Sequence, residues 1–210
     1  STVHWYETDW LKKLRQLRAG QYKTAWNNPT SQHTLLEFEI DTFNDPYSFR
    51  GPTQFHHARH HASHASAGYY TSPYRDAAVL VVDSIGEFET LTIWQGTDTQ
   101  LKRKFSQKYP HSLGLWYSAM TQRIGLQAQR DEYLVAQWGA KGDPHKLFIP
   151  MLNELVETRG MGIDPYIRMR ENMHRGVSWW RPELTTEQDM YDIAAATQQN
   201  VALQTAAQTN

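Results

Sequence analysis

Cysteine is absent from the 210 residues, so neither a disulfide framework nor thiolate chemistry contributes to this protein. An excess of charge of one sign is absent too, since 21 Lys and Arg stand against 22 Asp and Glu. A chain with this balance has no global positive field to attract nucleic acid. Apolar runs of the roughly 18 residues that a membrane span needs are also missing. These absences favour a cytoplasmic protein without nucleic-acid or membrane partners.

Histidine and the aromatic residues are, by contrast, abundant, with 10 His, 8 Trp and 11 Tyr. The chain begins Ser-Thr-Val-His-Trp, without an initiator Met or a signal peptide, and we therefore expect a piece of a longer polypeptide. A chain of this length can bury a sizeable core. We expect two regions, a helix with a connecting segment over 1–53 and an incomplete core domain over 54–210.

Five of the ten histidines fall within nine residues, namely His56, His57, His60, His61 and His64. A single helix through this segment would place the five rings within an arc of about 140°. His60 and His64 are four residues apart, so their rings would point the same way from successive turns. Two such imidazoles can bind one divalent metal ion, with a carboxylate at a strand end as a third ligand. The competing interpretations are hydrogen-bonded surface histidines or a purification tag, and the interleaved Ala and Ser disfavour a tag.

Local periodicity predicts an α/β chain. The expected elements of the first half are a helix over 5–19, a short strand over 34–40, a histidine helix ending near Tyr70, a buried strand over 77–82, and strands over 87–94 and 100–109. The last three strands should form an antiparallel meander centred on 77–82, with a tight loop over 83–87 that turns at 84–86. In the second half we expect helices over 112–124 (capped by Ser112), 132–138 and 144–157, an irregular stretch over 159–182, and a last helix capped by Thr185 or Thr186.

Four blocks of the chain follow a known pattern in matching order. HHASHASAGYYTSPYRDAAVLVVDSIGEFET, at 60–90, is similar to HHxxHAxxAxxxSPFxxAAVLxxDGxGEW. PHSLGLWYSAMT, at 110–121, looks like PhSLGxLYsaxT, and GluTyrLeu, at 132–134, stands where the pattern has Glu-x-Lys. DIAAATQQNV, at 192–201, is similar to a DiAasxQ helix. In these blocks the chain resembles the O-carbamoyltransferases, the family that carbamoylates Nod factors and several antibiotics.

The resemblance implies both a fold and a reaction. The fold would be a partial actin/Hsp70-like (RNase H-like, Kae1-like) α/β domain with an antiparallel β-meander and flanking helices. In the complete enzyme, carbamoyl phosphate and ATP would give carbamoyl-adenylate, whose carbamoyl group passes to a hydroxyl of a small-molecule acceptor. The missing Kae1-like lobe and a YrdC-like domain would act in cis or in trans, so the chain alone should be inactive.

The resemblance also implies which residues carry the site. The metal ligands, which would also be the catalytic residues, are His60, His64 and Asp83. The expected ion is divalent, with Fe²⁺ favoured. The residues expected to bind ATP or carbamoyl-adenylate are Ser84, Gly86, Glu87 and Glu132. A metal ion held by two imidazoles and a carboxylate keeps open positions for a substrate oxygen, which suits Lewis-acid catalysis.

Some departures from the pattern bear on the site. Ser84 replaces its first DGxGE glycine, Leu134 replaces the lysine of Glu-x-Lys, and the segment after Leu134 reads VAQWGAKG where the family has VMGLAPYG. A non-catalytic interaction module that keeps the fold is therefore one alternative. Another is a threonylcarbamoyl-transferase relative, which shares HxxxH but has a Ser-Gly-Gly-His-type loop where this chain has DSIGE. We expect neither His56 nor His57 to be a ligand, and His61 to face away from the metal or to support a ligand.

Overall fold

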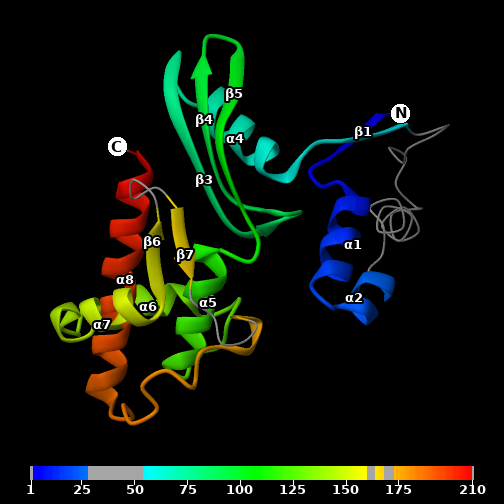
Figure 1. Cartoon of the computed structure of the whole chain (residues 1–210). Helices are drawn as coiled ribbons and strands as arrows, with labels where there is room; N and C mark the ends of the chain where they lie inside the picture. Colours follow the sequence, from blue (N-terminus) through cyan, green and yellow to red (C-terminus); the bar gives the residue numbers. More distant parts are fainter. Residues whose placement is uncertain (1, 28–53, 160–163, 168–172, 210) are drawn as a thin grey trace, which may run out of the picture. The chain divides into compact units, whose positions relative to one another are not determined.

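The computed structural model describes residues 2–27, 54–159, 164–167 and 173–209 (Figure 1). The predicted strand at 34–40 lies outside these residues. The chain is a mixed α/β protein, as predicted, and it divides into two compact units. The first unit takes residues 1–81, 86–89 and 93–104, and the second takes 82–85, 90–92 and 105–210. No helix in the described part is long and apolar enough to span a membrane.

The first unit opens with strand β1 (Thr2–Trp5), which pairs in parallel with β2 (Gln54–His57). Between them in sequence lie helix α1 (Asp9–Arg18), which confirms the predicted helix, and the short helix α2 (Tyr22–Asn27). Leu11 is the buried apolar residue of α1, whereas Trp10, Leu14 and Leu17 of the same helix are exposed. The helix is amphipathic, and most of its large apolar side chains lie on the surface of the chain.

Helix α4 (His60–Tyr70) is the histidine helix, and it ends where predicted. Thr71 is its C-cap, and Ser72 and Pro73 come next, where the residue before a proline is biased away from helical geometry. The prediction of one helix through all five histidines was wrong. His56 and His57 belong to β2, because the backbone of this segment pairs with β1, some 50 residues earlier in the chain.

A three-stranded antiparallel sheet follows, with strands β3 (Asp76–Gly86), β4 (Glu89–Thr97) and β5 (Gln100–Lys108) in the order β3-β4-β5. This confirms the meander. The central strand, however, is β4 and not 77–82, and β3 is mostly half-buried, with Val81 buried and Val82 42% exposed. The predicted turn at 84–86 was also wrong. The strand continues to Gly86, and the reversal falls at Glu87, whose φ is +57°.

Helix α4 packs on this sheet within the first unit. A Cβ added at Gly68 of α4 would lie 4.0 Å from the side chain of Val79, and one added at Gly96 of β4 would overlap the Tyr69 ring. The Tyr69 hydroxyl donates hydrogen bonds to the carbonyls of Arg75 and Asp98, so the helix end and the sheet end are tied together.

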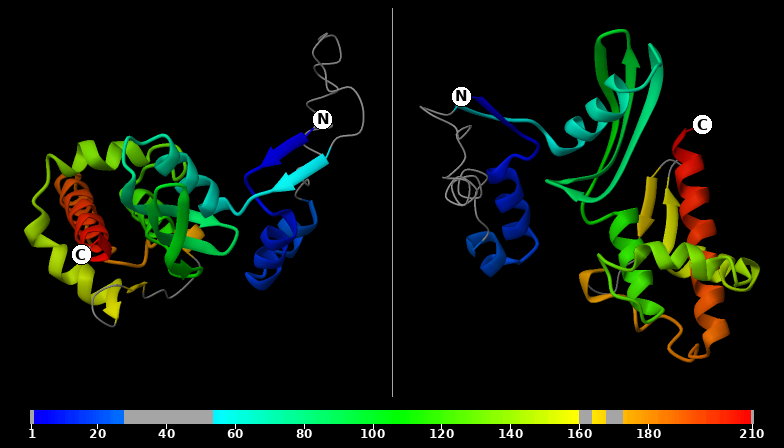
Figure 2. Two further views of the ribbon diagram at one scale, coloured as in Figure 1. Left: turned by 90° about the horizontal axis from the view of Figure 1, so that it is seen from above. Right: turned by 180° about the vertical axis from the view of Figure 1, so that it is seen from behind.

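The second unit is mainly helical. Its helices are α5 (Leu113–Arg123), α6 (Glu132–Gly139), α7 (Phe148–Glu154) and α8 (Glu187–Thr209), with 3₁₀ turns η1 (Pro144–Lys146) and η2 (Met173–Arg175). Helices α5, α6 and α7 pack against α8 (Figure 2). The core formed there includes the fully buried Trp116, Met120, Met151, Trp180 and Ile193.

The helix caps follow the predictions. Ser112 Oγ accepts a hydrogen bond from the Leu115 N–H, and Thr186 Oγ1 accepts one from the Asp189 N–H. The helix predicted over 144–157 is instead divided between η1 and α7. The stretch predicted as irregular contains η2 and part of an antiparallel pair, β6 (Val156–Arg159) with β7 (Asp164–Ile167).

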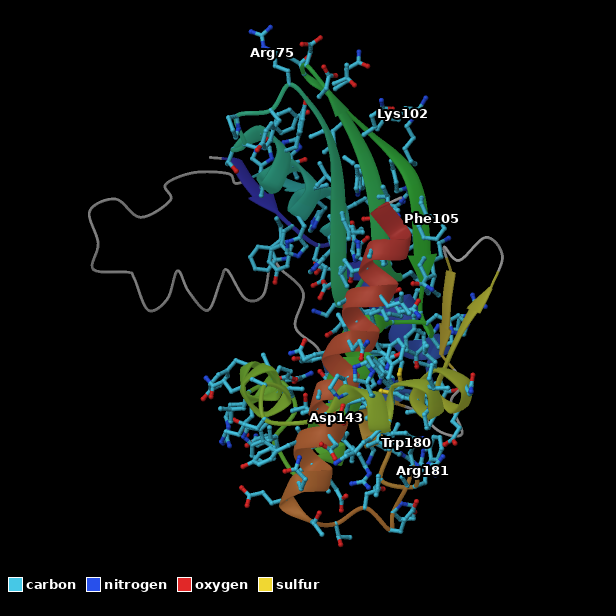
Figure 3. The ribbon with its side chains drawn as sticks, turned by 90° about the vertical axis from the view of Figure 1, so that its left-hand side faces the viewer. Arg75, Lys102, Phe105, Asp143, Trp180 and Arg181 are labelled. Atoms are coloured by element: carbon cyan, nitrogen blue, oxygen red, sulfur yellow. The ribbon has the colours of Figure 1, made fainter. Side chains whose placement is uncertain are left out.

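The segment before α8 is held by side chains as well as by the core. Trp180 and Arg181, both labelled in Figure 3, each donate to the Glu154 carboxylate of α7. Arg123 of α5 donates to the carbonyls of Trp180, Arg181 and Leu184. These bonds fix the entry of the chain into α8, which carries part of the candidate site.

Candidate functional site

His60 and His64 form a close pair on successive turns of α4. Their Nε2 atoms lie 3.0 Å apart, and their ring centroids are separated by 4.7 Å. Two nitrogen ligands of one metal ion are about 3 Å apart or slightly more, because each metal–nitrogen bond is about 2.0–2.1 Å long. The four-residue spacing therefore does what the sequence predicted, and it brings two imidazole nitrogens to chelating distance.

Gly86 lies directly against His60 of this pair, and against His61, in the first unit. A Cβ at Gly86 would fall 2.5 Å from His60 Cδ2 and 2.6 Å from His61 Cδ2. His61 is fully buried, so its ring has little room to retreat. Glycine is thus needed here for close approach, because the rings of His60 and His61 occupy the space that any side chain would take. The structure places Gly86 beside the histidines.

Glu87, which the family resemblance predicts to bind ATP or carbamoyl-adenylate, makes a hydrogen bond to the start of α1 in the described residues. Its side chain is buried, and one carboxylate oxygen accepts a hydrogen bond of 2.6 Å from the Thr8 N–H. Thr8 is the N-cap residue of α1, whose first N–H groups lack partners within the helix. Glu87 therefore anchors the start of α1 to the end of the DSIGE segment.

A pocket of about 440 Å³ lies in the second unit. It is lined by Val82, Asp83, Ser84, Leu113, Gly114, Tyr117, Ser118, Gln129, Glu132 and Val201. Three residues predicted for the site, Asp83, Ser84 and Glu132, are brought together here from segments about 50 residues apart. The contributions of α5 and α8 were not predicted, although the PHSLGLWYSAMT and DIAAATQQNV blocks that supply them were noticed.

Glu132 is held in its ionised form. Burial alone would raise the pKa of this carboxyl, but hydrogen bonds from the Gln129 N–H and from the Ser118 hydroxyl (2.8 Å) outweigh it and lower the pKa. A carboxylate with two fixed donors on one side can accept further hydrogen bonds from a ligand in the pocket. Glu132 is therefore suited to bind hydroxyl or N–H groups.

Tyr117 connects this wall of the pocket to α8. Its hydroxyl donates to the Glu132 carbonyl at 3.3 Å and accepts from Gln198 Nε2 at 2.8 Å. Burial raises the pKa of Tyr117, so the hydroxyl stays protonated at neutral pH. The apolar part of the pocket comes from Val82, Leu113 and Val201. The pocket can thus take a flat or apolar group next to one that hydrogen-bonds to Glu132.

Ser84 does not need the glycine that the family pattern has at this position. It lies within β3, and no positive φ occurs at it, so its Cβ introduces no backbone strain. Its N–H donates to the Asp83 carboxylate at 2.6 Å, and its carbonyl accepts from the Ser112 hydroxyl at 2.6 Å. The close approach falls on Gly114 instead, where a Cβ would lie 2.7 Å from the Ser84 nitrogen.

Leu134, the other departure, is half-buried on α6 and does not line the pocket. Any effect of the missing lysine is therefore a loss of charge near the pocket and not an obstruction of it. The described lining contains two carboxylates, on Asp83 and Glu132, and no Lys or Arg side chain.

Comparison with known proteins shows to which family the chain belongs. The family model for the carbamoyltransferase N-terminus matches residues 41–203, so the chain belongs to the carbamoyltransferases. Among curated proteins, it is 36% identical over 103 residues to an uncharacterized protein of Synechocystis sp., covering 49% of this chain and 17% of that protein. It is 26% identical over 151 residues to the nodulation protein NolNO of Sinorhizobium fredii, covering 70% of this chain and 22% of that protein. The matched stretch is about a fifth of the length of these relatives.

Proposed function

We propose that this chain carries the metal-binding core of an O-carbamoyltransferase. The complete enzyme would move a carbamoyl group from carbamoyl-adenylate, made from carbamoyl phosphate and ATP, to a hydroxyl of a small-molecule acceptor. The observation that carries the proposal is the 3.0 Å separation of the two Nε2 atoms on α4. Membership of the carbamoyltransferase family supplies the reaction class.

His60, His64 and Asp83 would hold the ion. Each offers one ligand atom of the required kind, a ring nitrogen from either histidine and a carboxylate oxygen from Asp83. Asp83 lies on β3 between Val79 and Gly86, and these two residues lie against opposite ends of α4. Asp83 is four residues after Val79, and side chains alternate along a strand, so both side chains leave the same face of β3. This order along β3 supports Asp83 as the third ligand.

A bound divalent ion, with Fe²⁺ as the expected one, would polarise the carbamoyl carbonyl and lower the pKa of the acceptor hydroxyl. The residues of this chain would bind and orient carbamoyl-adenylate. The Glu132 carboxylate would accept hydrogen bonds from hydroxyls of the nucleotide part of carbamoyl-adenylate. Val82, Leu113 and Val201 would cover its apolar surface and exclude water there. Gly86 would keep the His60 ring in place through its close approach.

The direct test of this proposal is metal content. Protein with both His60→Ala and His64→Ala should lose the divalent ion that the parent retains after exchange into metal-free buffer, as measured by elemental analysis. His145→Ala is the matched control, because His145 is an exposed histidine on η1 that lies outside the site. An undiminished metal content in the double variant would show that the assignment is wrong.

A non-catalytic interaction module is the second candidate, and one observation favours it. Helices α1 and α2 expose Trp10 (63%), Leu14 (49%), Tyr22 (68%) and Trp26 (88%), which suggests a surface covered by another polypeptide segment. The same observation suits an enzyme whose other parts, the second Kae1-like lobe and the YrdC-like domain, lie in cis or in trans. Carbamoyl transfer by the longest natural form of the protein would separate the two, because a module without turnover keeps the fold but not the reaction.

A further inference from the structure

The two-stranded sheet β1–β2 carries a second pair of histidines, separate from the pair on α4. His4 and His56 are direct cross-strand partners in the parallel register. Their ring centroids lie 5.1 Å apart, and the ring planes are inclined by 19°. Both residues are exposed. Two imidazoles thus leave the same face of one small sheet, side by side and open to solvent.

We propose that His4 and His56 form a second metal site, which binds a divalent ion that prefers imidazole ligands, such as Zn²⁺ or Ni²⁺. Neighbouring strands lie about 4.8 Å apart, so the two Cβ atoms start close together. Because both rings are exposed, each can change its side-chain rotamer without losing buried packing contacts. The nitrogens of the two rings can therefore converge on one ion, and water would complete its coordination.

The neighbouring histidine does not belong to this site. His57 follows His56 in the strand, so its side chain leaves the opposite face. Its Nδ1 also lies 2.9 Å from the backbone carbonyl of Glu7, to which it donates. Because one nitrogen of His57 is held in this way, the proposed site uses one histidine from each strand.

Such an ion would act as a clamp between two distant parts of the sequence. It would join β1 to β2, the strand that leads into α4. The pairing there consists of two short strands, extended by a hydrogen bond from the Ala58 N–H to the Trp5 carbonyl (2.8 Å). Isolated two-stranded pairs are only marginally stable. An ion that binds only the paired strands therefore stabilises their pairing.

The experiment separates this site from the one on α4 by removing the latter. Zinc is titrated calorimetrically into the full chain with His60→Ala and His64→Ala at a pH where imidazole is neutral. We expect about one zinc ion to bind. Adding His56→Gln should weaken this binding at least about tenfold, which corresponds to about 1.4 kcal/mol. Adding His145→Ala, another exposed histidine, should leave it unchanged.

Two results would overturn the proposal. One is the absence of zinc binding in the protein without His60 and His64, and the other is binding that His56→Gln leaves intact. Circular dichroism checks that each variant is folded, and His4→Gln provides an independent variant on the other strand. Hydrogen exchange gives a second readout, because zinc should slow exchange of the Ala58 N–H in the protein with His60→Ala and His64→Ala, but not when His56→Gln is added to these two substitutions. The outcome does not depend on carbamoyl transfer, since the test uses neither substrate nor the ligands on α4.

Discussion

Gly86 is the position at which a single methyl group should be most informative. In Gly86→Ala the new Cβ would lie 2.5 Å from His60 Cδ2 and 2.6 Å from His61 Cδ2. An ordinary contact begins near 3.4 Å, so the new Cβ would be too close to both rings by about 0.9 Å and about 0.8 Å. His61 is fully buried and has little room to move, so the backbone of residue 86 must shift as well as the His60 ring.

The expected loss of stability follows from two opposing effects. Overpacking in a well-packed region costs about 1–3 kcal/mol. Replacing Gly by Ala lowers the entropy of the unfolded chain and returns about 0.4–1 kcal/mol. The overpacking cost should exceed the entropic gain, so the Gly86→Ala protein should have a lower melting temperature than the parent. The expected decrease is about 2–4 °C for each kcal/mol of net destabilisation in a chain of this size.

Gly68→Ala is the matched control on α4. Its new Cβ would approach only the Val79 side chain, at 4.0 Å, and Ala favours the helix over Gly by about 0.5–1 kcal/mol. Thermal melts followed by circular dichroism should therefore move in opposite directions for the two variants. Gly86→Ala should also weaken metal retention, because metal–ligand distances tolerate only about 0.2 Å. A Gly86→Ala protein as stable as the Gly68→Ala protein would refute the close approach of β3 to the histidines.

Three further predictions test the sheet, the pocket and the completeness of the chain. Val81→Asp should destabilise the protein by several kcal/mol in urea melts, because Val81 is buried. Val82→Asp should have little effect, because Val82 is 42% exposed. Equal unfolding free energies for the two variants would contradict the burial of Val81 on β3. Since hydrogen bonds lower the pKa of Glu132 below its usual 4.5, its carboxylate contributes stability above that pH and loses it as the pH falls through the lower folded pKa. Glu132→Gln should thus be less stable than the parent at neutral pH, with a difference that shrinks on acidification; a constant difference would argue against an ionised Glu132. Finally, the isolated chain should bind ATP weakly or not at all by calorimetry and should transfer no carbamoyl group, whereas tight binding would mean that its nucleotide cleft is complete.

Much of the local structure could be predicted from the sequence, because it depends on neighbours within one or two turns. The spacing of His60 and His64 alone predicted a pair of rings on one helix face, now seen with nitrogens 3.0 Å apart. The caps at Ser112 and Thr186 and the end of α4 near Tyr70 are equally local, since each depends on side chains close to the helix end. The family was also recognisable from short blocks of sequence, and the family model that matches residues 41–203 agrees with it.

What the sequence could not determine depends on partners that are distant along the chain. His56 and His57 continue the histidine pattern, yet they form a strand because β1 supplies backbone partners some 50 residues away. The letters Ser84-Ile85-Gly86 are typical of a turn, but β3 extends through them and the chain reverses at Glu87. The pocket likewise combines Asp83 with Glu132 and Val201, from three elements that only folding brings together. Helical spacing is a property of a few consecutive residues, whereas strand ends and pocket walls are decided by pairing and packing between segments far apart in the chain.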